Sequence, residues 1–440
     1  MITEAFRNKV IQRLRFIYPE FQDEFYYHTL FNEINKNIRK KPQQKWNEQD
    51  AILITYGNSV QNEGEKPLQT LNRFINFHLR DWINTVHILP FFPYSSDTGF
   101  SVINYQEVNP KLGAWADIRR INTHTHLMMD LVINHASVRH PWFQQFLKGE
   151  SPGKNYFINI DPSTDLSSVV RPRSTPLLTP FETVDGKKYV WTTFSSDQVD
   201  LNFANPWLLL EIIKVLFRYI REGARIIRLD AIAFIWKEPG TSCLHLPQTH
   251  EIVKLFRDIV EYTNPHVLLL TETNVPDKEN HSYFGQGDEA HMIYQFSLPP
   301  LLLHALYTGN SKYLTNWAQS LPALPENCTY FNFTASHDGI GVRPLEGLIP
   351  RQELDDLIEA MKENGGEVST KTNSNGTISP YEINITYFDA MKSTGRNQEE
   401  FQLRRFLASQ TIMLAFKGID RKSTRLNSSH RYVSRMPSSA

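Results

Sequence analysis

The stretch ARIIRLDA (residues 224–231) is an apolar run of strand length that ends in an acidic residue, and HVLLLTETN (266–274) and CTYFNFTASHD (328–338) repeat this pattern. The three acidic residues, which we expect to be buried, are Asp230, Glu272 and Asp338. In a (β/α)8 barrel the C-terminal ends of all strands open into one bowl, where catalytic groups gather. Converging acids would repel one another unless they served a cationic transition state, such as the oxocarbenium-like state of glycosyl transfer. The pattern therefore predicts a barrel enzyme that acts on a glycosidic bond.

Four further apolar runs of strand length alternate with helical patterns, as in a parallel sheet with crossover helices. They are AILITYG (51–57), INTVHILP (83–90), HLMMDLVIN (126–134) and HMIYQFSLP (291–299). With the three acidic runs they give seven strands, and EEFQLRRFLASQTIMLAFKG (399–418) matches a seventh helix. We therefore predict an α/β fold, a (β/α)8 TIM barrel truncated before its eighth strand.

The remaining segments suggest a domain organisation. We expect an N-terminal helical extension at 1–50, a barrel formed by 51–135 and 206–419, and a small domain inserted after the third strand at 136–205, which is too long for an ordinary connection. Residues 420–440 begin DRKSTRLNSSH, which resembles a translated sequencing adapter, so we interpret them as an artefactual, disordered tail. The genuine protein would then continue differently. An open barrel exposes an unpaired strand edge, so we expect the literal chain to fold poorly and to be inactive.

Composition narrows the class of protein. The 440 residues are 40% hydrophobic and 12% aromatic, and the formal net charge of -1 gives no electrostatic footprint for nucleic acid. Only two cysteines occur, which argues against a disulfide scaffold. We find neither a signal peptide nor an apolar run of the roughly 20 residues that span a membrane. We expect a cytoplasmic enzyme with small-molecule partners.

The residues beside the three acids suggest acid–base chemistry. Arg228 and Asp230 lie two apart on one strand and face the same side, so the guanidinium should keep Asp230 ionised, as a nucleophile requires. Partial burial should raise the pKa of Glu272 and suit it to donate a proton. His337 and Asp338 pair a donor with an acceptor. The alternative for each pair is a structural ion pair or a strand-end cap.

Two further groups follow predicted strands. Asp97 could accept hydrogen bonds from sugar hydroxyls, and Phe100 could stack under a sugar ring. Alternatively, Asp97 belongs to an ordinary turn and Phe100 is a core aromatic residue. His135 could act in the bowl or, with His124 and His126, in a metal site. His124 and His126 straddle a strand start, at the end opposite the bowl, so we favour no metal.

Several motifs carry a family resemblance. DLVINH (130–135), RLDA (228–231), TETN (271–274) and TASHDG (334–339) resemble the four signature regions of the alpha-amylase superfamily of retaining glucosyl enzymes. LPFFPYSSDTGFSVINYQEVNPKLGAWADI (89–118) is similar to the sucrose phosphorylase branch. The resemblance covers nearly all of the chain before the tail.

The resemblance implies a role for each candidate residue. Asp230 resembles the nucleophile, Glu272 the acid/base and Asp338 the transition-state stabiliser. The residues that resemble nucleophile-binding or sugar-binding positions are Arg228, His135, His337, Asp97 and Phe100. The branch implies no metal or other cofactor, with inorganic phosphate as co-substrate and α-glucose 1-phosphate as product. The resemblance also implies an eighth strand, a glucose-clamping arginine and a C-terminal β-domain, which we expect to lie beyond Gly418 and therefore to be missing here.

Within the branch, the N-terminal extension and the wording WTTFSSDQVDLN (191–202) favour the glucosylglycerate phosphorylase type over sucrose phosphorylases. Arg171 and Arg173 are basic candidates for a phosphate or glycerate site, or ordinary surface arginines. Two alternatives stay open: a hydrolase or transglucosidase that uses the same carboxylates, and a non-catalytic sugar-binding homologue.

Overall fold

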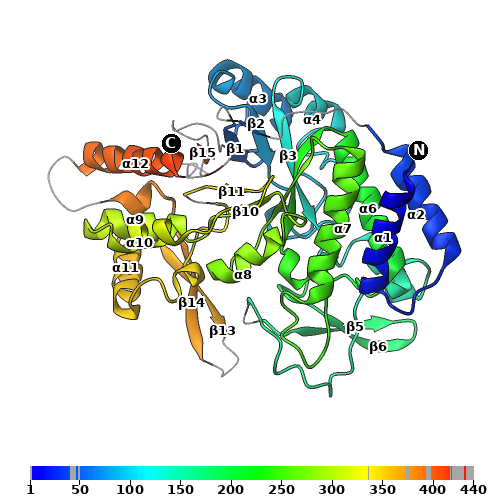
Figure 1. Cartoon of the computed structure of the whole chain (residues 1–440). Coiled ribbons are helices and arrows are strands. Elements are labelled where there is room, and N and C mark those ends of the chain that lie inside the picture. The colour runs from blue at the N-terminus through cyan, green and yellow to red at the C-terminus, as the bar shows by residue number, and fades with distance from the viewer. Residues whose placement is uncertain are drawn as a thin grey trace.

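A parallel β-sheet forms the centre of the molecule (Figure 1). The computed structural model describes residues 2–39, 46–47, 50–173, 175–334, 336–372, 377–392, 398–416, 418 and 431–432. Seven strands follow one another in the order β11-β10-β9-β8-β3-β2-β1, and every neighbouring pair is parallel. They are β1 (Ile52–Thr55), β2 (Thr85–Ile88), β3 (His126–Val132), β8 (Ala224–Asp230), β9 (Leu268–Thr271), β10 (Met292–Tyr294) and β11 (Thr329–Phe331). Each lies within one of the seven predicted runs, so the predicted barrel-type sheet is confirmed.

Helix α6 (Pro206–Arg221) shows how the sequence sets the crossovers. The side chain of Asn205 accepts a hydrogen bond from the backbone N–H of Trp207, and Pro206 takes the first helical position, where its missing N–H costs nothing. Gly223 follows the helix with a φ of 106°, a conformation that favours glycine. The next residue begins β8, so a sharp helix stop leads directly into the strand that carries Asp230.

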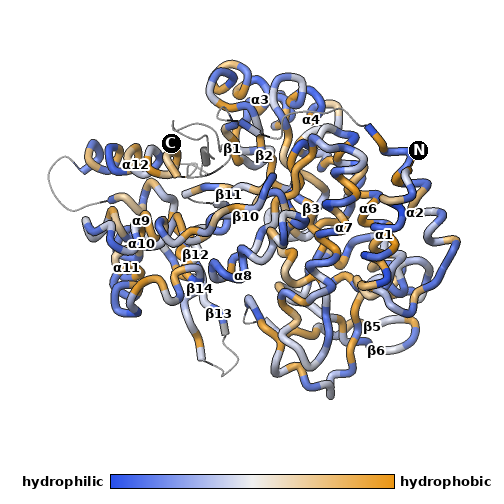
Figure 2. The backbone as a smooth tube through the Cα atoms, viewed as in Figure 1, coloured by the Kyte–Doolittle hydropathy of each residue, from blue (hydrophilic) through white to orange (hydrophobic). Residues whose placement is uncertain are grey.

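Several other helices also bury an apolar face, as α1 and α7 do. In Figure 2 hydrophobic and hydrophilic stretches alternate along helices such as α1 and α7, as expected for amphipathic helices. Besides α6, the helices that follow the sheet strands are α3 (Pro67–Phe74), α4 (Trp115–Ile121), α7 (Pro247–Thr263), α8 (Asp277–His281), α9 (Leu298–Thr308), α10 (Lys312–Ser320) and α12 (Gln398–Ala415). None of the helices in the described part of the chain has the length and apolar character needed to cross a membrane.

The sheet has two edges. One is β11, and at the other the two-residue strand β15 (Arg431–Tyr432) pairs parallel with β1 at Leu53 and Ile54. These two residues belong to the segment 420–440 that we interpreted as an artefactual tail, and here they take a short strand position. The rest of that segment lies outside the described residues.

The segment after β3 forms a small unit at the C-terminal end of the sheet. Strand β4 (His135–Ser137) pairs antiparallel with β7 (Gln198–Asp200), and β5 (Leu178–Thr183) pairs with β6 (Gly186–Trp191) as a hairpin. Helix α5 (Pro141–Lys148) lies between β4 and β5. Residues 136–205, which we call the first insert, therefore leave and re-enter the barrel through β4 and β7, and both strands lie at the bowl.

A second unit interrupts the barrel between β11 and α12, where we had assigned 206–419 to the barrel without interruption. It contains β12 (Ile340–Gly341), α11 (Arg351–Glu363), β13 (Glu367–Thr372) and β14 (Ile378–Asn384). The three strands form an antiparallel sheet in the order β12-β14-β13. Its apolar side chains, including Leu357 and Ile383, pack with residues of α9 and α12 into a cluster separate from the main core. We call residues 340–391 the second insert.

The N-terminal segment, where we expected a helical extension at 1–50, contains two helices in the part that the structure describes. Helices α1 (Glu4–Ile17) and α2 (Glu24–Lys36) begin with the capping side chains of Thr3 and Asp23. The Arg13 guanidinium contacts Glu251 and Asp258 of α7 at 2.8 and 3.0 Å. The extension is thus docked on the helix that precedes β9.

Candidate active site

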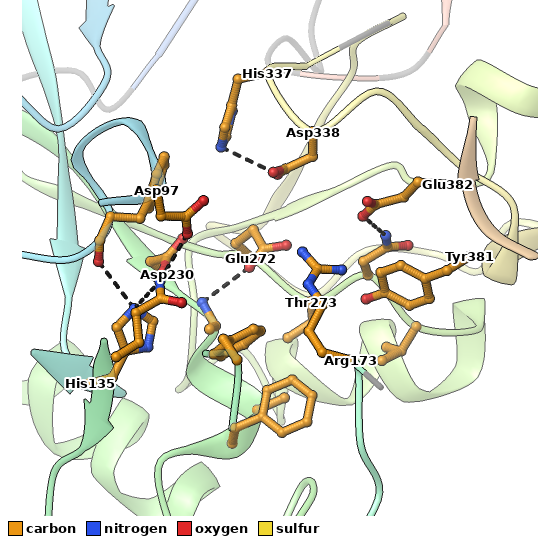
Figure 3. Close-up of a pocket in the computed structure, with 18 of the residues that line it drawn as sticks. Asp97, His135, Arg173, Asp230, Glu272, Thr273, His337, Asp338, Tyr381 and Glu382 are labelled. Carbon is orange, nitrogen blue, oxygen red and sulfur yellow. Dashed lines mark hydrogen bonds and ion pairs between the residues drawn. The ribbon is translucent and has the colours of Figure 1, made fainter. Parts of the chain in front are cut away.

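A pocket opens at the C-terminal ends of the barrel strands, and all eight predicted site residues line it. They are Asp97, Phe100, His135, Arg228, Asp230, Glu272, His337 and Asp338. The remaining lining residues are Arg173, Phe194, Gln198, Ala231, Ala233, Phe234, Thr273, Asn274, Val275, Arg343, Tyr381 and Glu382. In Figure 3, Asp97, His135 and Asp230 lie on one side, Arg173, Tyr381 and Glu382 lie on the other, and Glu272 lies between.

Strand β8 delivers Asp230 and Arg228 to the pocket floor. Arg228 Nη1 donates to Asp230 Oδ1 at 2.5 Å, because the two residues lie on one face of the strand. The next residue, Ala231, has a φ of 48°, and this left-handed turn directs its N–H to Glu272 Oε2 at 3.0 Å. A non-glycine residue in this conformation costs energy, and such residues cluster at functional sites. The turn thereby ties the end of β8 to the residue that follows β9.

The Glu272 carboxyl lies directly after β9 and is largely buried. Burial raises its pKa to about 7, the negative charges of Asp230 and Asp338 add to the rise, and Arg228 opposes it. Arg228 Nη2 lies 3.9 Å from Glu272 Oε2, farther than Nη1 lies from Asp230. The prediction of a raised pKa for Glu272 agrees with this environment. A carboxyl that titrates near neutral pH can donate and recover a proton.

Asp230 differs from the expectation in one respect. The predicted contact with Arg228 is present, but burial outweighs it and raises the pKa of Asp230 above its ordinary value. The nearby Asp130 carboxylate adds to the rise, whereas Arg228 and His135 oppose it. Arg228 therefore limits the rise in pKa rather than reversing it.

We predicted that Asp338 would be buried, and this prediction is wrong. Its side chain is 45% exposed, against 10% for Asp230 and 17% for Glu272. The reason is that β11 ends at Phe331, so Asp338 lies in the following loop and not at the strand end. Its Oδ2 lies 3.2 Å from His337 Nε2, and together they line the mouth of the pocket.

The loop after β2 contributes Asp97 and Phe100. The Phe100 ring stacks on His337, with centroids 4.8 Å apart and planes 3° apart. Its carbonyl accepts a hydrogen bond from His135 Nε2 at 3.1 Å. Asp97, at a φ of 53°, accepts from Gln198 Nε2 at 2.8 Å. Sequence reasoning missed Gln198, although it lies in the WTTFSSDQVDLN motif of the first insert.

The second insert supplies lining residues that we did not predict: Arg343, Tyr381 and Glu382. Burial raises the pKa of Glu382 to about 8, and Asp338 adds to the rise. Asn274 Nδ2 lies 3.4 Å from Glu382 Oε1. The one available signal was the length of the connection between β11 and the last predicted helix, which exceeds that of an ordinary loop.

Of the two arginines considered in the first insert, only Arg173 lines the pocket. Its guanidinium lies 5.6 Å from the centre of the Tyr381 ring, a cation–π distance. Arg171 instead donates to the backbone carbonyl of Thr175. The two inserts thus meet at Arg173 and Tyr381.

The metal alternative invoked His124, His126 and His135. His126 begins β3, whereas His135 lines the pocket beyond its other end. Within the described residues no three His, Cys, Asp or Glu side chains are grouped to hold a metal ion.

Comparison with known proteins identifies the family. The alpha amylase catalytic domain matches residues 82–340. A glucosylglycerate phosphorylase of Allomeiothermus silvanus is 48% identical over 95% of this chain and 75% of its own length, and one of Spirochaeta thermophila is 52% identical over 84% and 63%. This chain thus spans 75% of the length of the Allomeiothermus relative and 63%, less than two thirds, of the length of the Spirochaeta relative.

A solved structure agrees with these matches. The crystal structure of sucrose 6F-phosphate phosphorylase from Thermoanaerobacter thermosaccharolyticum superposes with a TM-score of 0.75 at 27% identity, covering 88% of this chain and 75% of that one. The matched domain includes most of the barrel strands and the pocket residues from Asp97 to Asp338. The chain belongs to the alpha-amylase family.

Proposed function

We propose that this chain is a retaining glucoside phosphorylase that transfers glucose from an α-glucoside to inorganic phosphate. The observation that carries the proposal is the meeting of Asp230 and Glu272 around Arg228 and Ala231 in one pocket. Retention requires a nucleophilic carboxylate and an acid/base carboxyl about 5 Å apart, close enough to serve one anomeric carbon. Two acids that share one guanidinium and one strand-end turn fit this requirement.

The reaction proceeds in two displacements. In the first, Asp230 attacks C1 of the glucosyl group, the bond from C1 to the leaving oxygen breaks, and Glu272 gives its proton to that oxygen. In the second, a phosphate oxygen attacks C1, Glu272 takes that oxygen's proton, and the bond from C1 to Asp230 breaks. The pKa of Glu272, raised to about 7 by burial, supports a proton transfer in both directions. Two inversions leave α-glucose 1-phosphate.

The other predicted residues fit the glucosyl side of the pocket. We assign Asp338, with His337, to stabilising the oxocarbenium-like transition state from the pocket mouth. Asp97 and His135 would bind sugar hydroxyls, and the Phe100 ring would pack against the sugar. Arg228 would hold the nucleophile. These roles rest on the pocket's geometry and on the family motifs that contain the residues.

The acceptor side of the pocket supports an anionic co-substrate. Arg173 and Arg343 line it from the two inserts, beside Glu382. Phosphate and the carboxylate of glycerate are both anions that guanidinium groups bind well. The relatives at 48% and 52% identity are glucosylglycerate phosphorylases, whereas a sucrose phosphorylase of Agrobacterium vitis is 30% identical. We therefore favour a glucosylglycerate-type substrate over sucrose.

The proposal includes no resident cofactor, with phosphate as the co-substrate and small molecules as partners. We also propose a cytoplasmic setting, because the chain contains only two cysteines, Cys243 and Cys328, and so low a cysteine content fits a reducing compartment.

The test is an incubation with glucosylglycerate and phosphate, with sucrose in parallel. Because this chain spans 75% of the Allomeiothermus relative, a second protein is assayed beside the 440-residue chain. It joins residues 1–419 to the segment of that relative that follows its matched region, and we call it the extended chain. We expect α-glucose 1-phosphate from glucosylglycerate. Free glucose alone would refute phosphorolysis and indicate a hydrolase.

A further inference from the structure

A line of buried polar side chains runs across three neighbouring strands beneath the pocket. It consists of His87 on β2, Asp130 on β3 and Arg228 on β8. These residues are 1%, 1% and 2% exposed, so water cannot substitute for any of their partners. Of the three, only Arg228 reaches the pocket. An uncompensated polar group at this depth is costly, so each contact in the line constrains the next.

Asp130 is the middle of this line and uses both carboxylate oxygens. Oδ2 accepts from His87 Nε2 at 2.7 Å, and Oδ1 accepts from Arg228 Nη1 at 2.7 Å. Burial by itself would raise the pKa of Asp130, but His87 and Arg228 outweigh it and lower that pKa to about 2. Asp130 is therefore an anion at neutral pH, and its orientation depends on both donors.

Arg228 Nη1 is shared between two carboxylates. It donates to Asp130 at 2.7 Å and to Asp230 at 2.5 Å, while Nη2 lies 3.9 Å from Glu272 Oε2. The guanidinium is thus placed by Asp130 on one side and by the two candidate catalytic acids on the other. Any shift of Asp130 alters how Arg228 divides its charge between Asp230 and Glu272.

His87 holds Asp130 through a single donor. Since Asp130 is an anion, Nε2 carries the proton, and the buried Nδ1 has no hydrogen-bond partner. Burial lowers the pKa of His87, although Asp130 opposes this, and a neutral imidazole fits an environment with one acceptor. A merely apolar core position would not need this donor.

We propose that His87 is a positioning residue of the active site, which by orienting Asp130 fixes how Arg228 is shared between Asp230 and Glu272. The inference rests on the proposed function, because it assigns Asp230 and Glu272 the roles given there. His87 itself does not line the pocket.

The charged and titratable groups around each member define the electrostatics of this line. Those facing His87 are Asp130, Arg228 and His337. Those facing Asp230 are Arg228, Asp130, His135 and Glu272. Without the His87 donor, the free oxygen of Asp130 turns to Arg228 and draws it from Asp230. The nucleophile is then less stabilised as an anion, so its deprotonation requires a higher pH.

The experiment compares His87→Leu, which removes the donor, with His87→Gln, which keeps an amide donor. Two readouts are recorded against pH in the extended chain: kcat/KM for glucose 1-phosphate formation, and the affinity of the cationic glucose mimic 1-deoxynojirimycin. For His87→Leu we expect kcat/KM to fall by about tenfold and the acidic limb of both profiles to move up by about half a pH unit. His87→Gln should restore much of both.

Thr85→Val is the matched control, because Thr85 is a buried polar residue on the same strand whose hydroxyl donates a hydrogen bond to Oδ1 of the neighbouring Asn84 at 3.1 Å. It should leave the pH profiles unchanged even where it lowers the melting temperature. The inference is overturned if His87→Leu lowers stability but keeps the wild-type profiles, or if the Leu and Gln variants behave alike. A wild type that releases no glucose 1-phosphate refutes the proposed function instead, and the pH profile of inhibitor affinity still tests the role of His87.

Discussion

The two sides of the pocket are built from different kinds of structure. Asp230 ends the barrel strand β8, and Glu272 follows β9. The Glu272 carboxyl accepts from the Ala231 N–H, and Arg228 donates to Asp230. Arg343 and Glu382 come from the second insert, and Arg173 from the first. The parallel sheet therefore fixes the carboxylates of the proposed bond-breaking step, whereas separate excursions of the chain supply the groups that face an acceptor. This division predicts that changes on the two sides have effects of different size and kind.

The largest effect is expected from Asp230→Asn on the barrel side. The amide cannot form the glucosyl ester, so the rate of glucose 1-phosphate formation should fall by about 10^4-fold or more. The substitution keeps the size of the side chain, and the melting temperature should change little. Initial rates with glucosylglycerate and phosphate check this. Near wild-type rates would show that another group is the nucleophile.

Glu272→Gln tests the second barrel carboxyl through the pH dependence. As a general acid, Glu272 must be protonated to act, so with a pKa of about 7 the wild-type rate should fall as pH rises through 7. The Gln variant should be about 10^2- to 10^4-fold slower and should lose this basic limb. A substrate with a good leaving group, which needs no proton, should restore its first step. A basic limb that persists in the variant would contradict the assignment.

The barrel side was also the more predictable side. The strands of Asp230 and Glu272 are short apolar runs between helical patterns. In a barrel, a residue at the C-terminal end of a strand lies at the active-site face. Asp338 shows where this logic stops, since several loop residues separate it from β11 and sequence cannot give their path.

The acceptor side could not be derived in the same way. ISPYEIN (378–384) mixes apolar and polar residues without strict alternation, and nothing in it says that β14 pairs between β12 and β13 or that Glu382 faces the pocket. Such contacts depend on how two inserts dock on each other and on the barrel. They are long-range packing outcomes rather than local ones.

The next prediction concerns the buried contact between the barrel and the first insert. Lys237 Nζ, after β8, lies 2.8 Å from Asp200 Oδ2 on β7 and 2.9 Å from Asn134 Oδ1 after β3, and the Lys237 and Asp200 side chains are 3% and 0% exposed. Lys237→Met strands a buried carboxylate and should lower the free energy of unfolding by about 3–5 kcal/mol. Urea denaturation of the wild type and the variant measures this change in the free energy of unfolding.

The control for this contact is Lys214→Met on α6, where Lys214 pairs with Glu211 at the surface, at 37% and 31% exposure. Removing such a pair should change the free energy of unfolding by no more than about 1 kcal/mol. Equal losses in the two variants would mean that the buried pair does not hold the insert to the barrel.

Arg173→Ala and Arg171→Ala form the sharpest test of the acceptor side. The two arginines lie in one loop, but only Arg173 lines the pocket, while Arg171 donates to the Thr175 carbonyl. Losing one charged hydrogen bond to an anion costs about 1.5–3 kcal/mol, so Arg173→Ala should raise the KM for phosphate roughly 10- to 100-fold. Arg171→Ala should leave it unchanged.

The partition of products separates acceptor binding from catalysis. With Arg173→Ala and saturating glucosylglycerate, the glucosyl-enzyme should still form at the wild-type rate, because Asp230 and Glu272 are untouched, but more of it should react with water. The ratio of glucose to glucose 1-phosphate should therefore rise at fixed phosphate and return towards the wild-type value as phosphate increases. If instead glucosyl-enzyme formation slows even at saturating glucosylglycerate, Arg173 acts on the barrel chemistry, and the division between the two sides of the pocket fails at that residue.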